Sequence, residues 1–462
     1  MTARRDSFLV VGFGVTGHAV ARYLRQRRAD VTVVDNQPVP GGQRVADELG
    51  VNFVDCPSRA TLAAVGESSS MVVPSPGVGF DHPVYAIARE AGVPVRSEIE
   101  LAWDCLAERA HPPSLIAVTG TNGKTTVVTL VTAMLNQSGQ AAIAAGNIGL
   151  PLIDAVPLET RTIVAEVSSF QLQYTQRFHP TVSCWLNLAE NHLDWHPTMA
   201  HYAAAKARIW AAQGEGDVAV LNRDDRAVLA ASRDGRVGLP AGVQGITFSI
   251  DGAADFWVDR QRGVLRSPDG AELADLQRLP RALPHDLGNG LAASAVALAA
   301  GASTEACRVT LTTFPGLAHR VEYIGEAAGV RWFDDSKATT LASVLAAVAG
   351  FSSVVLIAGG RNKGLDLRAL ARTAPPVRAV VAIGESAHDV VAAFSRCDGV
   401  AVISAAGMAE AVTAAAALAR PGDAVLLSPG CASFDWYHSY GERGDDFTLL
   451  VTAQLEKEGS HP

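Results

Sequence analysis

Residues 115–126 read Leu115-Ile-Ala-Val-Thr-Gly120-Thr-Asn-Gly123-Lys124-Thr125-Thr126. The apolar run predicts a buried strand, the two glycines predict a tight loop, and the residues after them predict the start of a helix. Backbone N–H groups of such a loop converge on phosphate oxygens, while Lys124 can reach the β- and γ-phosphates and the Thr125 hydroxyl can bind Mg²⁺. Val118 stands where the usual phosphate-loop pattern has its first glycine. The segment still predicts a binding site for a nucleoside triphosphate.

Acidic side chains and a histidine follow two further apolar segments. Thr162-Ile-Val-Ala-Glu166 predicts a strand that ends in a carboxylate, the usual source of a second metal ligand. Leu186-Asn-Leu-Ala-Glu190-Asn-His192-Leu-Asp194 places a histidine between two acids after another strand. Open α/β sheets bind their ligands at the carboxyl ends of the strands. Glu166 and His192 are therefore candidate ligands of a metal ion or a phosphate.

Short apolar segments alternate with alanine-rich ones through nearly the whole chain, which is typical of an α/β fold. Strands are predicted at 8–11, 31–34, 71–73, 115–118, 163–165, 354–357, 380–383 and 424–427. Helices are predicted at 17–26, 124–137, 291–300, 338–349 and 407–419. Proline-containing segments at 109–114 and 312–318 interrupt the alternation, because proline removes a backbone donor and restricts the residue before it. We therefore expect three domains, 1–112, 113–317 and 318–462, with additional short strands between 235 and 283.

The composition is that of a globular protein, since hydrophobic residues make up 48% of the 462 residues and charged residues 18%. The formal net charge of −9 argues against a nucleic-acid partner, because nucleic-acid binders usually present a basic face. No apolar run reaches the roughly 20 residues needed to span a bilayer. Six widely spaced cysteines include no Cys-x-x-Cys pair. We expect reduced thiols, no membrane insertion and a cytoplasmic location.

A second glycine motif, Gly12-Phe-Gly14-Val-Thr-Gly17, follows the first predicted strand, and Asp35 ends the next strand. Taken alone, this spacing indicates a dinucleotide-binding turn and hence an oxidoreductase that uses a nicotinamide or flavin cofactor. The physical requirement is broader, because a glycine turn at a helix N-terminus accepts any phosphate group. The motif therefore predicts a nucleotide in the first domain and leaves its identity open.

Several segments together resemble the Mur ligase family and its folylpolyglutamate synthase relatives, in the same order and along essentially the whole chain. They are Thr119-Gly-Thr-Asn-Gly-Lys-Thr-Thr126, Glu166-Val-Ser-Ser-Phe-Gln-Leu172, Asn191-His-Leu-Asp194, Ala205-Lys-Ala-Arg-Ile209 and Phe314-Pro-Gly-Leu-Ala-His-Arg-Val-Glu322. The resemblance implies a Rossmann-like N-terminal domain that holds UDP instead of NAD, a central P-loop ATPase-type domain with a mostly parallel sheet, and a Rossmann-like C-terminal domain. It also implies an ATP-dependent ligase that forms an amide bond through an acyl phosphate and releases ADP and phosphate.

The segment Asp334-Asp-Ser-Lys-Ala-Thr-Thr340 resembles the form found in family members that add D-glutamate, where Asn usually stands in place of Thr340. The resemblance implies that the substrates are ATP, D-glutamate and UDP-N-acetylmuramoyl-L-alanine, in peptidoglycan synthesis, and we expect a monomer. Glutamate brings two carboxylates, which cationic and hydrogen-bonding groups must hold. By resemblance, D-glutamate is bound by Lys337, Thr339, Lys363, Ser433 and Tyr440.

The resemblance also assigns the other site residues by position. The catalytic residues are Lys124, His192 and Lys206, and two Mg²⁺ or Mn²⁺ ions are held by Thr125, Glu166, His192 and Lys206, the last as a carbamate. The ATP-binding residues are Gly120, Thr121, Asn122, Gly123, Lys124, Thr125, Thr126, Asn289, His319, Arg320 and Asp335. The residues for the UDP substrate are Gly14, Thr16, Asp35, Asn36, Ser75, Gly77, Asn147 and Ser168. Asp286 replaces a second Asn of the ATP site, which leaves the role of that position open.

Three other interpretations remain at this point. The first is a different Mur or polyglutamate ligase, against which the segment 335–339 and the Rossmann-like N-terminal domain argue. The second is a redox enzyme that uses the glycine motif at 12–17, which bound NAD would reveal. The third is a nucleotide-binding scaffold without catalysis, against which the intact phosphate loop and Glu166 argue.

Overall fold

The computed structural model of the chain describes residues 6–193, 195–457 and 459. Its three sheets consist mostly of parallel strands connected by helices, so the predicted α/β class is confirmed. The chain forms two compact units, residues 1–276 with 289–312 and residues 277–288 with 313–462. Among the described residues, no helix is long and apolar enough to cross a membrane.

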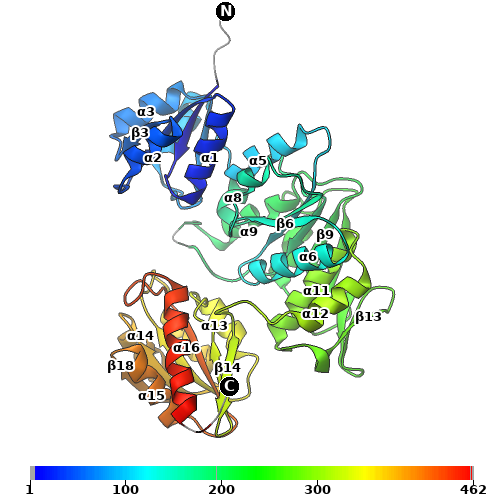
Figure 1. The fold of residues 1–462 in the computed structure, drawn as a ribbon, viewed down its shortest axis with the longest axis vertical. Coiled ribbons are helices and arrows are strands. Elements are labelled where there is room, and N and C mark those ends of the chain that lie inside the picture. Colours follow the sequence, from blue (N-terminus) through cyan, green and yellow to red (C-terminus); the bar gives the residue numbers. More distant parts are fainter. Residues whose placement is uncertain (1–5, 194, 458, 460–462) are drawn as a thin grey trace, which may run out of the picture. The chain divides into compact units, whose positions relative to one another are not determined.

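The first sheet of the first unit, drawn in blue in Figure 1, has four parallel strands in the order β3-β2-β1-β4. Its elements are β1 (Ser7–Val11), α1 (Val15–Gln26), β2 (Asp30–Asp35), α2 (Gly42–Leu49), β3 (Asn52–Asp55), α3 (Arg59–Ser68), β4 (Met71–Pro74) and α4 (Pro83–Ala91). Gly12 has a φ of +92°, and a side chain at Gly17 would place its Cβ 2.0 Å from the Gly12 carbonyl oxygen. The tight turn from β1 into α1 therefore requires both glycines.

The second sheet of the first unit has nine strands in the order β13-β12-β11-β10-β9-β8-β5-β7-β6. Only its pairings β11–β12 and β12–β13 are antiparallel in the part of the chain described. Its elements are α5 (Glu98–Ala107), β5 (Ser114–Thr119), α6 (Lys124–Gln137), β6 (Ala142–Gly146), α7 (Leu152–Ala155), β7 (Thr162–Glu166), α8 (Ser169–Gln173), β8 (Val182–Trp185), α9 (Met199–Ala207), η1 (Arg208–Trp210), β9 (Val218–Asn222), α10 (Arg226–Ser232), β10 (Gln244–Ser249), β11 (Phe256–Asp259), β12 (Val264–Arg266) and β13 (Glu272–Asp275). Three further helices include residues of both units, namely η2 (Leu276–Arg278), α11 (Pro284–Ala299) and α12 (Thr304–Thr313). The short strands expected between 235 and 283 are β10 to β13.

Strand β5 lies between β7 and β8, and all three run in the same direction. Buried apolar side chains, among them Ala117, Ile163 and Trp185, hold these strands in one core. Because the strands are parallel, their carboxyl ends reach the same edge of the sheet. The phosphate loop after β5 and the carboxylate of Glu166 at the end of β7 are thereby brought together.

The second unit contains a six-stranded sheet in the order β14-β15-β19-β16-β17-β18, in which only β14 is antiparallel to its neighbour among the strands described. Its elements are β14 (Glu322–Ala327), β15 (Val330–Asp334), α13 (Leu341–Val348), β16 (Val354–Gly359), η3 (Leu367–Thr373), β17 (Val377–Ile383), α14 (Ala387–Phe394), β18 (Ala401–Ala405), α15 (Met408–Leu418), β19 (Ala424–Gly430) and α16 (Tyr440–Lys457). Side chains of α13, η3 and α14 cover one face of the sheet, and those of α15 and α16 the other. The central strand β16 is therefore buried on both faces.

Helix α13 begins three residues later than predicted. The expected helix covered 338–349, whereas α13 covers Leu341–Val348. Residues before it form turns, in which the N–H of Ala338 donates to Asp335 O and that of Thr339 donates to Lys337 O, both at 2.8 Å. Alanine is the strongest helix former, so its propensity at 338 extended the predicted helix beyond its true start.

Candidate active site

The loop between β5 and α6 surrounds the ammonium group of a lysine. Lys124 is the first residue of α6, and its Nζ donates to the carbonyl oxygens of Gly120 at 2.9 Å and Thr121 at 3.0 Å. Gly123 precedes it with a φ of +83°, which lets the chain turn into the helix. The positive end of the helix and the lysine together favour an anionic group such as a phosphate. Thr126 lies in the first turn of the same helix.

An asparagine outside the predicted set fixes the backbone of this loop. Asn187 follows β8, and its Oδ1 accepts from the backbone N–H groups of Thr121 and Asn122, both at 2.9 Å. Its Nδ2 donates to Asn122 O at 3.1 Å. Asn187 follows a strand and lies five residues before His192 in the sequence. This position was a usable signal, because sheets of this kind bind their ligands at the carboxyl ends of the strands.

Glu166 faces the phosphate loop with both carboxylate oxygens engaged. Its Oε2 accepts from the Thr125 hydroxyl at 2.8 Å, and its Oε1 accepts from Asn147 Nδ2 at 2.9 Å. Glu166 is only 3% exposed. The structure therefore unites the two side chains predicted to hold the first metal ion. It also places Asn147 beside them, and a role of Asn147 toward the UDP substrate stays a prediction.

Lys206 is buried at the same loop, although most lysines lie at the surface. Its Nζ, in a residue 1% exposed, donates to Gly120 O at 2.9 Å and to Thr119 Oγ1 at 3.4 Å. It also lies 4.8 Å from the centre of the Tyr202 ring. Burial lowers the pKa of Lys206 well below its usual range, Lys124 lowers it further, and Glu166 opposes the shift. The surroundings thus favour the neutral amine.

His192 is half-buried among aromatic rings. Its ring centre lies 4.7 Å from that of Phe170 and 6.3 Å from that of Tyr202. Its backbone has a φ of +56°, a conformation uncommon for residues other than glycine. Such a conformation often marks a functional position. Asp194, quoted with His192 in the sequence, lies outside the described residues.

A second histidine in this segment was not singled out from the sequence. His196 is fully buried, and its two ring nitrogens lie 2.8 Å from Ser169 Oγ and 2.9 Å from His201 Nδ1. Burial, with a contribution from His201, lowers the pKa of His196 to about 3. The N–H of His196 donates to His192 O at 2.8 Å, so this buried group supports the turn that carries His192.

Asn289 reaches the phosphate loop from α11. A Cβ added at Gly123 would lie 2.4 Å from Asn289 Oδ1. The predicted ATP-site asparagine and the last glycine of the loop are therefore in close contact, although they are far apart in the sequence.

The glycine turn of the first sheet is held by two residues predicted to meet the UDP substrate. The Asp35 carboxylate accepts from the N–H groups of Phe13 at 2.7 Å and Gln37 at 3.0 Å. The Ser75 hydroxyl donates to Gly12 O at 3.0 Å. Because β1, β2 and β4 are parallel, the residues after them share one edge of the sheet, namely Gly14, Thr16, Asp35, Asn36, Ser75 and Gly77. The side chain of Asn36 lies 2.7 Å from His82 Nε2.

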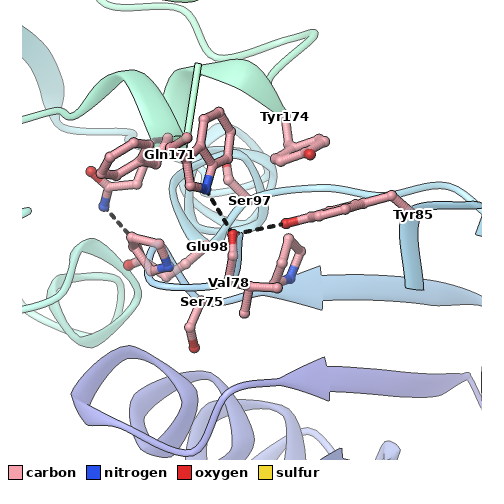
Figure 2. A pocket seen from close by; sticks show the side chains of 11 residues that line it. Ser75, Val78, Tyr85, Ser97, Glu98, Gln171 and Tyr174 are labelled. Carbon is pink, nitrogen blue, oxygen red and sulfur yellow. Dashed lines mark hydrogen bonds between the residues drawn. The ribbon is translucent and has the colours of Figure 1, made fainter. Parts of the chain in front are cut away.

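A small pocket lies between the loop after β4 and helix α8 (Figure 2). Val78 O accepts there from Trp195 Nε1 at 2.8 Å and from the Tyr85 hydroxyl at 3.4 Å. Glu98 lines the pocket and accepts from Ile153 N–H at 2.6 Å. Burial raises the pKa of Glu98 to about 7.

Ser168, another predicted residue of the UDP substrate, caps helix α8. Its hydroxyl accepts from Gln171 N–H at 3.2 Å, and its own N–H donates to Gln171 Oε1 at 3.0 Å. This reciprocal pair is a capping box, which fixes the start of the helix. The Nε2 of Gln171 reaches Glu98 Oε2 at 3.5 Å (Figure 2).

In the second unit, three residues predicted to contact ATP lie around one turn. His319 Nδ1 lies 2.6 Å from Asp334 Oδ2, and its N–H donates to Glu322 Oε2 at 2.9 Å. Asp335 is buried and accepts from the Ser428 hydroxyl at 2.7 Å and from Val321 N–H at 3.3 Å. Burial raises the pKa of Asp335 to about 7. Arg320 lies in the turn itself.

Asp286, whose role the sequence left open, pairs with Arg281. The Asp286 oxygens accept from Arg281 Nε and Nη2, both at 2.6 Å. The remaining Arg281 nitrogen, Nη1, donates to Arg320 O at 2.9 Å and to Val321 O. Sequence analysis missed Arg281, because the pattern around it contains no signal for such a contact.

Two of the predicted D-glutamate residues lie together, since Lys337 Nζ is 3.6 Å from the centre of the Tyr440 ring. Arg443 underlies them: it donates to Ser336 Oγ at 2.9 Å, and that hydroxyl donates to Tyr440 O at 2.7 Å. Burial lowers the pKa of Arg443 to about 10.

The other predicted D-glutamate residues differ in exposure. Thr339 is half-buried in the turn before α13, and Ser433 is buried after β19. Lys363 is exposed, with its Nζ 5.9 Å from the centre of the Phe434 ring. Whether these groups and the phosphate loop serve one reaction stays a prediction.

Three stretches of the chain match domains of one family. Residues 6–97 match the Mur ligase MurD-like N-terminal domain, residues 118–296 the Mur ligase middle domain, and residues 319–431 the Mur ligase glutamate ligase domain. The UDP-N-acetylmuramoylalanine–D-glutamate ligase of Frankia casuarinae is 42% identical over 96% of this chain and 94% of its own. The enzyme of the same name from Pelotomaculum thermopropionicum is 41% identical over 97% of each chain.

Solved structures share the fold at lower identity. A pseudomurein peptide ligase type C from Methanothermus fervidus is 16% identical with a TM-score of 0.59, over 97% of this chain and all of its own. MurF from Acinetobacter baumannii is 18% identical with a TM-score of 0.57, over 99% of this chain and 92% of its own. The sequence relatives, similar over nearly their whole length, show more than the fold: this chain belongs to the Mur ligase family.

Proposed function

We propose that this chain is the ATP-dependent ligase that joins D-glutamate to UDP-N-acetylmuramoyl-L-alanine in peptidoglycan synthesis. The observation that carries the proposal is the group of side chains at the carboxyl ends of β5 and β7. There Lys124 and Lys206 both donate to the carbonyl oxygen of Gly120. The carboxylate of Glu166 accepts from the hydroxyl of Thr125, the residue after Lys124. The names of the relatives at 42% and 41% identity support the choice of substrates.

The reaction has two steps. The alanyl carboxylate of the UDP substrate attacks the γ-phosphorus of ATP, so that an acyl phosphate forms and ADP leaves. The amine of D-glutamate then attacks the acyl carbon, the tetrahedral intermediate expels phosphate, and the amine loses a proton. Because the reacting groups are anionic, positioning and charge neutralisation dominate catalysis. Lys124 neutralises the phosphoryl group during its transfer.

The residues around the loop fit Mg²⁺. Thr125 offers a hydroxyl oxygen and Glu166 a carboxylate, and Mg²⁺ prefers such oxygen ligands. These two residues would hold one ion, and His192 with a carbamate at Lys206 would hold the second. When bound, the ions supply positive charge at the phosphates.

The carbamate forms when the neutral amine of Lys206 adds to CO₂ and loses a proton. It turns a cation that repels metal ions into an anion that binds them. The burial of the Lys206 side chain supports this step, because it favours the amine over the ammonium form.

The remaining residues bind substrates. Besides the phosphate loop, the ATP-binding residues are Asn289 in the first unit and His319, Arg320 and Asp335 in the second. Lys337, Thr339, Lys363, Ser433 and Tyr440 bind D-glutamate. The UDP substrate is bound by the residues at the edge of the first sheet with Asn147 and Ser168. The enzyme is a monomer in the cytoplasm whose partners are small molecules, with domains at 1–112, 113–317 and 318–462.

Phosphate release with a panel of amino acids tests the proposal. With ATP, Mg²⁺ and UDP-N-acetylmuramoyl-L-alanine, D-glutamate should support turnover, whereas L-glutamate, L-alanine and L-lysine should not. L-glutamate should fail because the inverted centre misdirects the amine, and catalysis by proximity tolerates little displacement. Equal rates with both glutamate enantiomers, or turnover with another amino acid only, would contradict the proposal. Bound NAD, detected by absorbance, would favour the redox alternative.

A further inference from the structure

The turn at residues 319–321 holds two residues in the left-handed region of backbone conformation. His319 has a φ of +61° and Val321 a φ of +49°. For valine, which is branched at Cβ, this conformation is a genuine outlier. Outliers of this kind persist only where surrounding groups hold them. The groups that hold this turn therefore determine where His319 and Arg320 are presented.

Hydrogen bonds from buried or half-buried side chains hold the turn. Arg281 Nη1 donates to Arg320 O at 2.9 Å and to Val321 O, and the Asp335 carboxylate accepts from Val321 N–H. The other edge of the Arg281 guanidinium is held by both oxygens of Asp286, each at 2.6 Å. The side chains of Arg281 and Asp286 are only 21% and 16% exposed, so this pair is weakly screened by solvent.

We propose that Arg281 and Asp286 are positioning residues for ATP. The pair fixes the carbonyl oxygens of the turn and so presents Arg320 and His319 to the nucleotide. The inference rests on the proposed function. Aspartate, and not the Asn usual at 286, suits this task, because two carboxylate oxygens accept both N–H groups of one guanidinium edge. A carboxamide offers one acceptor, and its own N–H groups would face those of Arg281.

Steady-state kinetics of two variants and a matched control tests the proposal. Arg281→Ala removes the contact to the turn, and Asp286→Asn keeps the side-chain volume but weakens the hold on Arg281. The control is Arg378→Ala, because Arg378 is similarly exposed at 23%, pairs with Asp423, and donates to Leu418 O at 2.6 Å away from the proposed site. All three variants remove or weaken one arginine–aspartate pair of the second unit.

We expect the KM for ATP to rise about tenfold in Arg281→Ala and by a smaller factor in Asp286→Asn, with kcat and the KM for D-glutamate little changed. The KM for ATP should stay at the wild-type value in Arg378→Ala. Guanidinium chloride at millimolar concentration should lower the raised KM of Arg281→Ala, and sodium chloride at the same concentration should not. This rescue separates positioning from a general loss of stability.

An unchanged KM for ATP in a folded Arg281→Ala would overturn the inference, as would an equal rise in Arg378→Ala. If Arg281→Ala does not fold, Asp286→Asn decides, because it preserves the volume of the side chain. A wild-type protein without D-glutamate-dependent turnover would refute the proposed function instead. The inference would then be judged by calorimetric ATP binding, where affinity should fall in the order wild type, Asp286→Asn, Arg281→Ala.

Discussion

At the scale of single residues, two lysines share one acceptor. The carbonyl oxygen of Gly120 accepts from Lys124 Nζ and from Lys206 Nζ, each at 2.9 Å. Two ammonium groups this close repel each other, and the repulsion is stronger away from water. Lys206 is buried whereas Lys124 is half-buried, so the neutral form is favoured at Lys206. The two side chains are therefore suited to different tasks, one to phosphate and one to carbamate formation.

Substitution of Lys124 tests the first task. Lys124→Ala should lower turnover by at least about 10²–10³-fold, because it removes a charged contact to the transferring phosphoryl group. Binding of the UDP substrate, measured by calorimetry, should stay nearly intact, since most of the residues proposed for it belong to another sheet and Lys124 is not among them. Lys457→Ala, at the exposed end of α16, serves as the control. A Lys124→Ala enzyme that kept more than about a tenth of wild-type turnover would disprove the role of the loop.

Chemical rescue tests the second task. Lys206→Ala should lose most ligase activity, and a short carboxylic acid added to the assay should restore part of it by occupying the place of the carbamate. The rescue should saturate as the concentration of the acid rises. It should be absent in Lys124→Ala, because that variant keeps Lys206 and so has no empty carbamate site for the acid to fill. Full activity of Lys206→Ala without the acid would reject the carbamate. An inactive variant without rescue would leave Lys206 a structural role only.

At the scale of elements, helix α13 shows how a departure from the usual sequence is accommodated. Thr340 stands where family members that add D-glutamate usually have Asn, and it is the N-cap of α13. Its hydroxyl accepts from Ser343 N–H at 3.3 Å. Threonine and asparagine both cap helices well, because each offers an oxygen to the first unpaired N–H groups. The substitution therefore preserves the local structure.

This cap can be tested by its effect on stability. Thr340→Ala should lower the free energy of unfolding by about 1 kcal/mol, because one N–H at the start of α13 loses its acceptor. Thr340→Asn should change the free energy of unfolding by at most a few tenths of about 1 kcal/mol. The midpoint of urea denaturation, followed by far-UV circular dichroism, measures both. A larger loss in the Asn variant than in the Ala variant would refute the capping role.

Most elements could be predicted, since each predicted strand contains an apolar run and the predicted helices at 291–300, 338–349 and 407–419 are rich in alanine. The start of α11 was predicted too late, at 291 instead of Pro284. Helix α6 was predicted at its observed bounds, Lys124–Gln137, because a glycine loop marks its start. The start of α13 was predicted too early, since turn and helix compete at Ala338. The turn at 319–321 could not be predicted, because its left-handed residues depend on side chains distant in sequence.

At the scale of the whole molecule, each unit contains a buried carboxyl group whose pKa is raised to about 7 by burial. They are Glu98 in the first unit and Asp335 in the second. Between about pH 4 and pH 7, the folded state therefore keeps a proton that the unfolded state has already released. Since the folded state binds more protons in that range, the stability contributed by each group is present at low pH and is lost as pH rises toward 7.

Glu98→Gln tests this dependence. The variant should remove a pH-dependent contribution on the order of 3 kcal/mol between about pH 4 and pH 7, so its stability should fall less over that range than that of the wild type. Urea denaturation at several pH values measures the slope. Glu108→Gln, at an exposed position, should leave the slope unchanged. Parallel profiles for Glu98→Gln and the wild type would show that Glu98 titrates normally.

The site could be predicted from sequence where one segment contains several of its members, as in the phosphate loop. Asn187 and Arg281 were missed because their roles arise from contacts between segments. Asn187 fixes the loop from a different strand, and Arg281 holds a turn far along the chain. Tertiary contacts of single polar residues leave no periodicity in a sequence, so only the folded chain reveals the role of Arg281, whereas the position of Asn187 after a strand was a signal that could have been used.

The contact between Gly123 and Asn289 constrains how this sequence can evolve. A methyl group at 123 would meet the Asn289 oxygen at 2.4 Å and would also disfavour the left-handed backbone at that position. A larger residue at 289 would press on the same loop. A smaller side chain at 289 would remove the steric conflict but not the backbone strain, so glycine stays favoured at 123 whichever residue evolves at 289. The dependence between the two sites thus runs in one direction: the loop glycine leaves the room that the asparagine occupies.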